Sequence, residues 1–218
     1  MSIKNNLLKI LDDLPQDISL VAVSKTKSNE QINEAYEAGQ RIFGENKIQE
    51  MVPKWRELPK DIEWHMIGTV QRNKVKYMAE FVSLIHSVDS LKLLKEINKQ
   101  GIKNNRKINC LLQMHIAQEQ TKFGLDEAEL FDLIDSEEFG NLKNVTIKGL
   151  MGMATFTDDE EQIREEFAYL YSVYLKLKKK IPELNVLSMG MSGDYKIAIE
   201  EGSTMVRIGS SIFGVRNS

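Results

Sequence analysis

Residues 19–27 read Ser-Leu-Val-Ala-Val-Ser-Lys-Thr-Lys, a short apolar run that is followed by Lys25. Short apolar runs that contain β-branched residues are typical of buried strands. An ammonium group directly after a buried strand must reach solvent or sit in a pocket of low dielectric, where a neutral amine is a nucleophile towards carbonyls. Lys25 is therefore a candidate Schiff-base lysine. The alternative is that Lys25 only marks where the strand meets water, since lysine is rarely fully buried.

Strand-like and helix-like segments alternate along the rest of the chain. Further apolar runs predict strands at 41–44, 62–67, 81–86, 108–116, 145–151, 185–188 and 205–209. Helical periodicity and end signals predict helices at 2–13, 28–39, 46–55, 71–80, 89–101, 126 onward, 157–181 and 194–201. Capping boxes are expected to begin three of these helices, at Ser28, Asp126 and Thr157.

The predicted strands are continuous apolar runs rather than alternating ones, which is typical of a parallel sheet covered by helices. Eight such units close a (β/α)8 barrel, the TIM barrel, and 218 residues is near the small end of its usual size. We therefore predict an α/β chain whose residues 1–218 form a single barrel domain. An open, doubly wound sheet is the alternative.

Composition limits the classes of function. The net charge is −3 with both signs interspersed, so the sequence has no electrostatic footprint for nucleic acid or an anionic membrane. The single cysteine, Cys110, lies inside an apolar run and is expected to be inert core. The N-terminus lacks an uninterrupted apolar segment, so we expect a cytoplasmic protein without membrane or nucleic-acid partners.

Unusual polar residues gather where the predicted strands end, which is the active face of a parallel barrel. They are Lys25, Glu45, Asn46, His65, His86, Ser87, His115, the segment 188–195 and Arg207. Each histidine could instead be a buried hydrogen-bonding residue. No two histidines have the spacing of a helical zinc site, so we predict no metal.

Two segments of small residues follow the last two strands. They are Met191-Ser192-Gly193 and Ile208-Gly209-Ser210-Ser211. Barrels place phosphate groups at this position, against backbone amides and a short helix. The side chains are too small to block an anion, and Ser192 and Ser210 can donate hydroxyls. The alternative is that the glycines only form turns.

Arg207 lies within the apolar strand Met-Val-Arg-Ile-Gly. A guanidinium there is costly unless it has an acceptor, which could be a carboxylate such as Glu45 or Asp89, or a group on a ligand. A lysine, an arginine and a phosphate-binding segment at one end of a barrel together suit the binding of a phosphorylated heteroaromatic aldehyde. Pyridoxal 5′-phosphate (PLP) fits each part.

The sequence resembles the pyridoxal phosphate homeostasis proteins, also called the YggS/PROSC or alanine racemase N-terminal domain-like family. The resemblance runs from about residue 18 to the end, in the blocks VAVSKTK (21–27), FGENKIQE (43–50), WHMIGTVQRNK (64–74), HSVDS (86–90), TKFGL (121–125), KGLMGM (148–153), LSMGMSGDY (187–195) and STMVRIGSSIFGVR (203–216). Departures from the usual family pattern are Thr69-Val70, His115 and Gly152-Met153.

The resemblance implies a fold-type III PLP-binding barrel in which Lys25 carries the cofactor as an internal aldimine. It further implies that the phosphate is held by Ser192, Gly209 and Ser210, that Arg207 faces the pyridine nitrogen, and that Asn46 and His65 lie near the ring. Alanine racemases use a tyrosine contributed through a second, β-rich domain, and we expect no such domain here. We therefore expect storage, buffering or delivery of PLP in vitamin B6 homeostasis, without racemase turnover and with no catalytic residue.

Three rival functions stay open at this stage. They are a PLP-dependent amino-acid racemase or related enzyme, a Schiff-base aldolase without cofactor, and an interaction module with a vestigial pocket. We expect PLP as the partner molecule, PLP-dependent apo-enzymes as its recipients, and a monomer or weak homodimer. Lys122 and the other rim lysines could hold the cofactor during transfer, although most are expected to be solvated surface charge.

Overall fold

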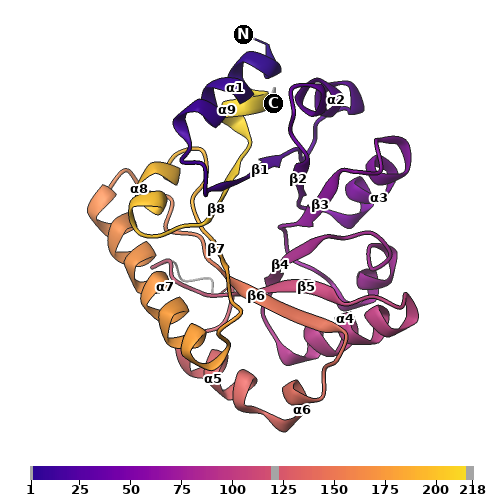
Figure 1. Cartoon of the computed structure of the whole chain (residues 1–218). Coiled ribbons are helices and arrows are strands. Elements are labelled where there is room, and N and C mark those ends of the chain that lie inside the picture. The colour runs from indigo at the N-terminus through magenta and orange to yellow at the C-terminus, as the bar shows by residue number, and fades with distance from the viewer. Residues whose placement is uncertain (1, 119–122, 215–218) are drawn as a thin grey trace.

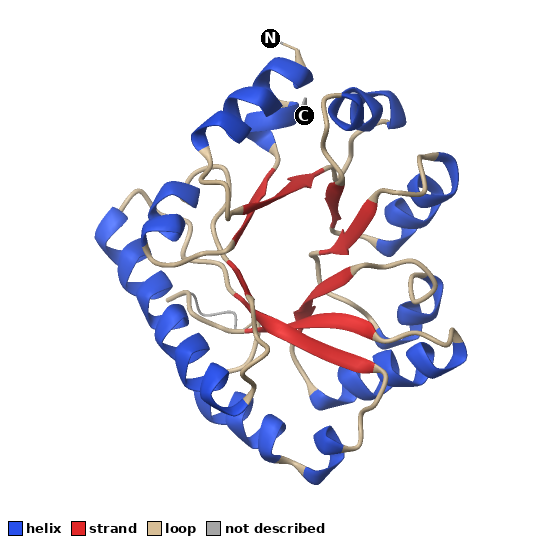
Figure 2. Ribbon diagram, viewed as in Figure 1, coloured by secondary structure: helices blue, strands red, loops and turns tan. Residues whose placement is uncertain are grey.

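The computed structural model describes residues 2–118 and 123–214, and its centre is a closed barrel of eight parallel strands (Figures 1 and 2). The strands are β1 (Ser19–Val23), β2 (Ile42–Glu45), β3 (Glu63–Met66), β4 (Leu84–Val88), β5 (Ile108–Gln113), β6 (Val145–Met151), β7 (Val186–Ser188) and β8 (Met205–Ile208). β1 pairs with β2 on one side and with β8 on the other. The predicted barrel is confirmed, and the open sheet is wrong.

Helices surround the barrel (Figure 2). They are α1 (Ile3–Asp13), α2 (Asn29–Glu37), α3 (Ile48–Glu57), the 3₁₀ helix η1 (Arg72–Tyr77), α4 (Leu91–Lys103), α5 (Glu127–Asp135), α6 (Glu137–Gly140), α7 (Glu160–Lys180), α8 (Tyr195–Glu200) and α9 (Ser210–Phe213). The capping boxes predicted at Ser28 and Asp126 are confirmed. The one predicted at Thr157 is wrong, because Asp159 accepts the first free amides of α7.

Two predicted boundaries are also corrected. β4 begins at Leu84 rather than 81, because the turn after η1 continues through hydrogen bonds from the amides of residues 81 and 82 to the carbonyl of Met78. α4 does not stop at Gly101 but runs to Lys103. A Cβ at Gly101 would lie 2.8 Å from the Asn144 carbonyl oxygen, so the glycine permits a close approach of the neighbouring loop rather than ending the helix.

The apolar core has two parts. The larger part lies between strands and helices and includes the fully buried Phe43 and Trp64. A smaller cluster is formed by Val21, Leu84, Leu111, Met151 and Met205. Because side chains alternate along a strand, Met205 shares the inner face of β8 with Arg207. The barrel interior is therefore apolar at the level of Met205 and polar nearer the carboxyl ends of the strands.

Cys110 is fully buried in the core, and burial raises the pKa of its thiol. This agrees with the expectation of an inert residue. In the described part of the chain, none of the helices combines the length and the apolar character that crossing a membrane requires.

Candidate functional site

A pocket of about 740 Å³ opens at the carboxyl ends of the strands. Its lining comes from the ends of β1, β2, β3, β6, β7 and β8, and includes Lys25, Asn46, Ser192, Arg207, Gly209 and Ser210. Its volume lies within the range of roughly 300–1,000 Å³ that small-molecule sites occupy. The pocket therefore brings together six of the seven predicted binding residues.

Residues on both sides of Lys25 are held by α3. The amide of Thr26 donates to Glu50 Oε2 at 2.9 Å, and Thr26 has a φ of +63°, in the left-handed region. A β-branched residue is uncommon there, and such backbone strain costs about 1–3 kcal/mol. On the other side, the Ser24 carbonyl accepts a hydrogen bond of 2.9 Å from Lys54 Nζ. The chain thus leaves β1 in a fixed conformation at Lys25.

Lys54 also forms a buried ion pair with Glu45. Its Nζ lies 2.8 Å from Glu45 Oε1, which also accepts a 2.6 Å hydrogen bond from the Ser24 hydroxyl. Burial raises the pKa of the Glu45 carboxyl, and the Lys54 ammonium partly offsets this. The ion pair holds Ser24, the residue before Lys25, in place. Neither of its two members lines the pocket.

Arg207 is 4% exposed and enters the pocket wall from β8. One of its terminal nitrogens donates to the Ser188 hydroxyl at 2.6 Å and the other to the Gly152 carbonyl at 3.1 Å. The alternative that Glu45 or Asp89 is its carboxylate partner is wrong, because both of its hydrogen-bond acceptors are neutral. Burial lowers the pKa of the guanidinium to about 10, and the nearby charge of Asp194 opposes this shift.

A chain of hydrogen bonds continues from Arg207 across the barrel. Ser188 Oγ lies 3.0 Å from His86 Nδ1, and His86 Nε2 lies 3.0 Å from His65 Nδ1. Because Ser188 accepts from Arg207, its own proton is directed to His86 Nδ1, so His86 carries its proton on Nε2 and donates to His65. Burial lowers the pKa of both rings, that of His65 to about 3, so both are neutral at pH 7.

The two small-residue segments meet on the opposite side of the pocket from the histidines' strands. The Gly209 amide donates to Ser192 Oγ at 3.3 Å, which joins the loop after β7 to the loop after β8. The Met191 amide donates to Asp194 Oδ1 at 2.5 Å, and burial raises the pKa of that carboxyl. A Cβ at Gly209 would lie 3.1 Å from Val23 Cβ, so the backbone can pass this close only at a small residue.

Two predicted positions differ from expectation or cannot be placed. His65 is not in the pocket lining, because its ring is buried beside His86 behind it. Lys122 lies outside the described residues. Sequence reasoning missed Lys54 and considered Ser188 only as part of a rim segment, and the signal for both was a polar residue at a position that the fold buries.

The segment after β6 was not predicted to form part of the site. Residues 153–158 line the pocket, and Phe156 there is 98% exposed. Glu166 of α7 holds this segment, because its carboxylate accepts from the Thr155 amide at 2.6 Å and from the Thr155 hydroxyl at 2.7 Å. A single buried glutamate in a long helix therefore positions one wall of the pocket.

The donor set suits a phosphorylated aldehyde. An amine at Lys25, a guanidinium at Arg207 and hydroxyls at Ser192 and Ser210 line one pocket. The amine can condense with an aldehyde, and the backbone and hydroxyl donors of the two small-residue segments can bind a phosphate. The residues present therefore fit a group of the PLP class.

Comparison with known proteins gives the same family over nearly the whole chain. Residues 1–217 match the family model described as alanine racemase, N-terminal domain. The pyridoxal phosphate homeostasis protein of Vibrio alginolyticus is 42% identical over 208 residues, covering 93% of this chain and 88% of that protein. The structure of PipY from Synechococcus elongatus with PLP bound is 35% identical, with a TM-score of 0.89 and coverage of 98% of this chain and 100% of PipY.

An alanine racemase of Clostridium difficile shares the fold at 15% identity, with a TM-score of 0.78. All of this chain aligns with only 57% of that enzyme. The family model and the relatives of the same length agree with the resemblance seen in the motifs. The chain belongs to the pyridoxal phosphate homeostasis protein family.

Proposed function

We propose that this chain binds PLP in the pocket at the carboxyl ends of the strands and takes part in PLP homeostasis, by storing, buffering or delivering the cofactor. The observation that carries the proposal is that Lys25, Arg207 and the two small-residue segments line one pocket. The relatives support it, since the Vibrio protein is named for PLP homeostasis and PipY has a structure with PLP bound.

In this proposal Lys25 Nζ forms a Schiff base with the cofactor. When bound, PLP supplies an electrophilic aldehyde, a pyridine ring and a phosphate. Ser192, Ser210 and the backbone at Gly209 hold the phosphate, and Asn46 lies beside the ring. Arg207 keeps its guanidinium charged at neutral pH and donates to the pyridine nitrogen.

The proposal that the protein carries PLP without racemase turnover rests on which residues line the pocket. A two-base racemase needs a second acid or base on the face opposite Lys25. Among the described lining residues there is no tyrosine, histidine or cysteine. The carboxylate of Asp194 is engaged by the Met191 amide, and Lys27 donates to the carbonyls of Phe213 and Gly214. Asp158 is the lining carboxylate that a racemase reading would have to use.

Reductive trapping tests the Schiff base. Purified protein is incubated with PLP, reduced with borohydride, and examined by intact mass and peptide mapping. We expect one added cofactor on Lys25, none on Lys25→Ala, and unchanged labelling of Lys25 in Lys27→Ala, a matched control because Lys27 lines the same pocket. A label confined to another lysine would contradict the proposal.

Proton exchange separates the carrier from the racemase. PLP-loaded protein is incubated with D- and L-amino acids in deuterated water, and loss of the α-proton is followed by NMR. We expect no measurable turnover. Turnover that Asp158→Asn abolishes would favour the racemase, and the carrier reading would then be withdrawn.

A further inference from the structure

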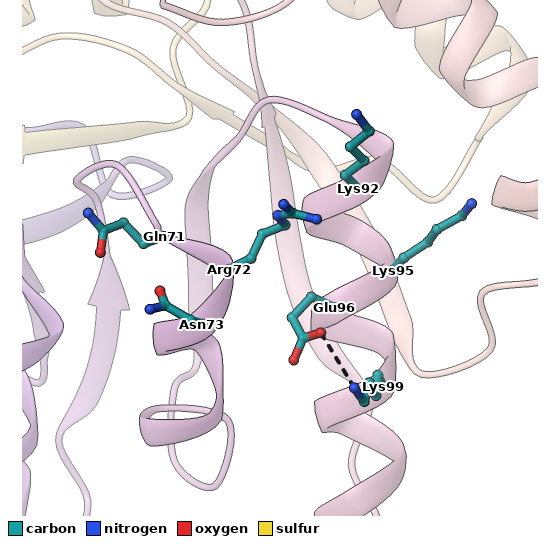
Figure 3. Close-up of a pocket in the computed structure, with 7 residues that line it drawn as sticks. All are labelled: Gln71, Arg72, Asn73, Lys92, Lys95, Glu96 and Lys99. Atoms are coloured by element: carbon teal, nitrogen blue, oxygen red, sulfur yellow. Dashed lines mark ion pairs between the residues drawn. The ribbon is translucent and has the colours of Figure 1, made fainter.

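A second hollow lies between η1 and α4, apart from the pocket. It is an open hollow of about 800 Å³ and is lined by Gln71, Arg72, Asn73, Lys92, Lys95, Glu96 and Lys99 (Figure 3). We call it the basic groove. Every one of these side chains is polar or charged.

The groove carries an excess of positive charge. Four of its side chains are cationic and one is a carboxylate, although the whole chain has a net charge of −3. Lys95 pairs with Glu138 of α6 at 2.6 Å, and Lys99 lies 4.0 Å from Glu96. Arg72 and Lys92 make no ion pair or hydrogen bond within residues 2–118 and 123–214. These two side chains are available to an anionic partner.

The spacing of the cations indicates an extended ligand. Lys92 and Lys99 are seven residues apart on one helix, which corresponds to about 10 Å along its axis. A single phosphate or carboxylate cannot contact both ends. An extended peptide advances about 3.3 Å per residue, so a run of about four residues spans the distance. Aromatic side chains, on which single-stranded nucleic acid stacks, are missing from the groove lining.

The groove shares a loop with the pocket. Ile67, at the end of β3, lines the pocket, and Gln71 lines the groove. Between them, Gly68 is packed closely on the segment after β2, where a Cβ would clash with the Asn46 carbonyl oxygen, and its own carbonyl accepts from the Ser87 hydroxyl at 2.5 Å. Residues 67–71 therefore connect one wall of the pocket to the groove.

We propose that the basic groove docks an acidic segment of a partner protein, with Arg72 and Lys92 as its main contacts. The partner's carboxylates pair with these cations at the end of the groove nearer the strands' carboxyl ends, and Lys99 extends the contact along α4. Such exposed pairs steer association and make it sensitive to salt. The docked partner sits next to the mouth from which a small ligand leaves the barrel.

The test measures binding of a fluorescein-labelled hexaglutamate peptide by anisotropy, at low and at physiological salt. We expect saturable, salt-sensitive binding that Arg72→Glu/Lys92→Glu weakens about tenfold or more, because two contacts become repulsive. Lys178→Glu/Lys179→Glu is the matched control: it makes the same charge change on exposed residues at the end of α7 and should keep affinity within about twofold. Lys25→Ala should bind the peptide like the wild type.

Three results would overturn the proposal. The first is equal affinity of the wild type and the groove variant, or no binding at millimolar peptide. The second is equally tight, groove-dependent binding of a single-stranded oligonucleotide, which would assign the groove to general polyanions. The third is self-association in sedimentation that the groove variant abolishes, which would identify the occupant as a second copy. Because Lys25→Ala retains the groove, failure of PLP binding is distinguished from failure of docking.

Discussion

Replacing Lys54 by methionine would leave the Glu45 carboxylate in the barrel wall without its counter-ion. Glu45 is 0% exposed, and its Oε2 already has no hydrogen-bond partner among the described residues. Without Lys54 the carboxyl must stay protonated at pH 7, and for a group with an ordinary pKa of 4.5 this costs about 3.4 kcal/mol. Loss of the hydrogen bond to the Ser24 carbonyl adds about 1 kcal/mol.

The expected decrease in the free energy of unfolding is therefore about 3–5 kcal/mol, the usual cost of breaking a buried ion pair. It is measured by urea denaturation followed by circular dichroism, and corresponds to a decrease in Tm of roughly 10 °C. Glu45 has a raised folded-state pKa, so the folded state of the variant binds the extra proton and its deficit should shrink as pH falls towards 4.5.

Glu45→Gln in the Lys54→Met background is the control, because a neutral amide needs no counter-ion. We expect it to restore most of the lost stability at pH 7. The reasoning is refuted by a deficit below about 1 kcal/mol, by a deficit that is the same at pH 5 and pH 7, or by no rescue in the double variant. A weaker affinity for PLP in Lys54→Met alone would show that the ion pair also positions Lys25.

Three further outcomes follow from the barrel interior. Ser188→Ala removes the hydroxyl partner of one Arg207 nitrogen and of His86 Nδ1, while the bonds from Arg207 to the Gly152 carbonyl and from His86 to His65 remain. It should lower the free energy of unfolding by about 2–4 kcal/mol in urea denaturation, whereas Ser188→Thr should retain most of it. Burial lowers the folded-state pKa of His65 from 6.5 to about 3, so its contribution to the free energy of unfolding is present above pH 6.5 and is lost as the pH falls. When the free energy of unfolding is plotted against pH, the slope below pH 6.5 should be smaller for His65→Gln than for the wild type, by about 1.4 kcal/mol per pH unit. Gly149→Ala would place a Cβ 1.6 Å from a β7 carbonyl oxygen and should prevent soluble expression of folded protein, which wild-type-like circular dichroism would contradict.

The fold was predictable because its signals are local and repeated. Short apolar runs such as 20–23 and 110–112 identify buried parallel strands, and the capping boxes at Ser28 and Asp126 begin helices where the sequence places them. The closing of the sheet into a barrel was harder to predict than the strands themselves, because it requires β1 to pair with β8, which lies almost the whole chain away in the sequence. Predicted helix ends were wrong where another nearby residue made the capping contact, as at α7, which Asp159 caps in place of Thr157.

The candidate site was predictable to the extent that the fold fixes which residues reach the carboxyl ends of the strands. That rule placed Lys25, Asn46 and Arg207 in one pocket. The same rule placed His65 in the pocket as well, but its position in β3 directs its ring into the barrel, towards His86. Residue type alone does not reveal whether a histidine at a strand end faces the ligand or another buried polar group.

Lys25 and Arg207, two of the three cations that line the pocket, are supported in different ways. The segment carrying Lys25 is fixed through a neighbouring ion pair of opposite charges, Lys54 and Glu45, which adds no net charge to the pocket. Arg207 donates to a hydroxyl and a carbonyl, neither of which carries a charge, and the charge of Asp194 acts on it from nearby. The relay through Ser188 and the two neutral histidines therefore adds no charge of its own beside Arg207.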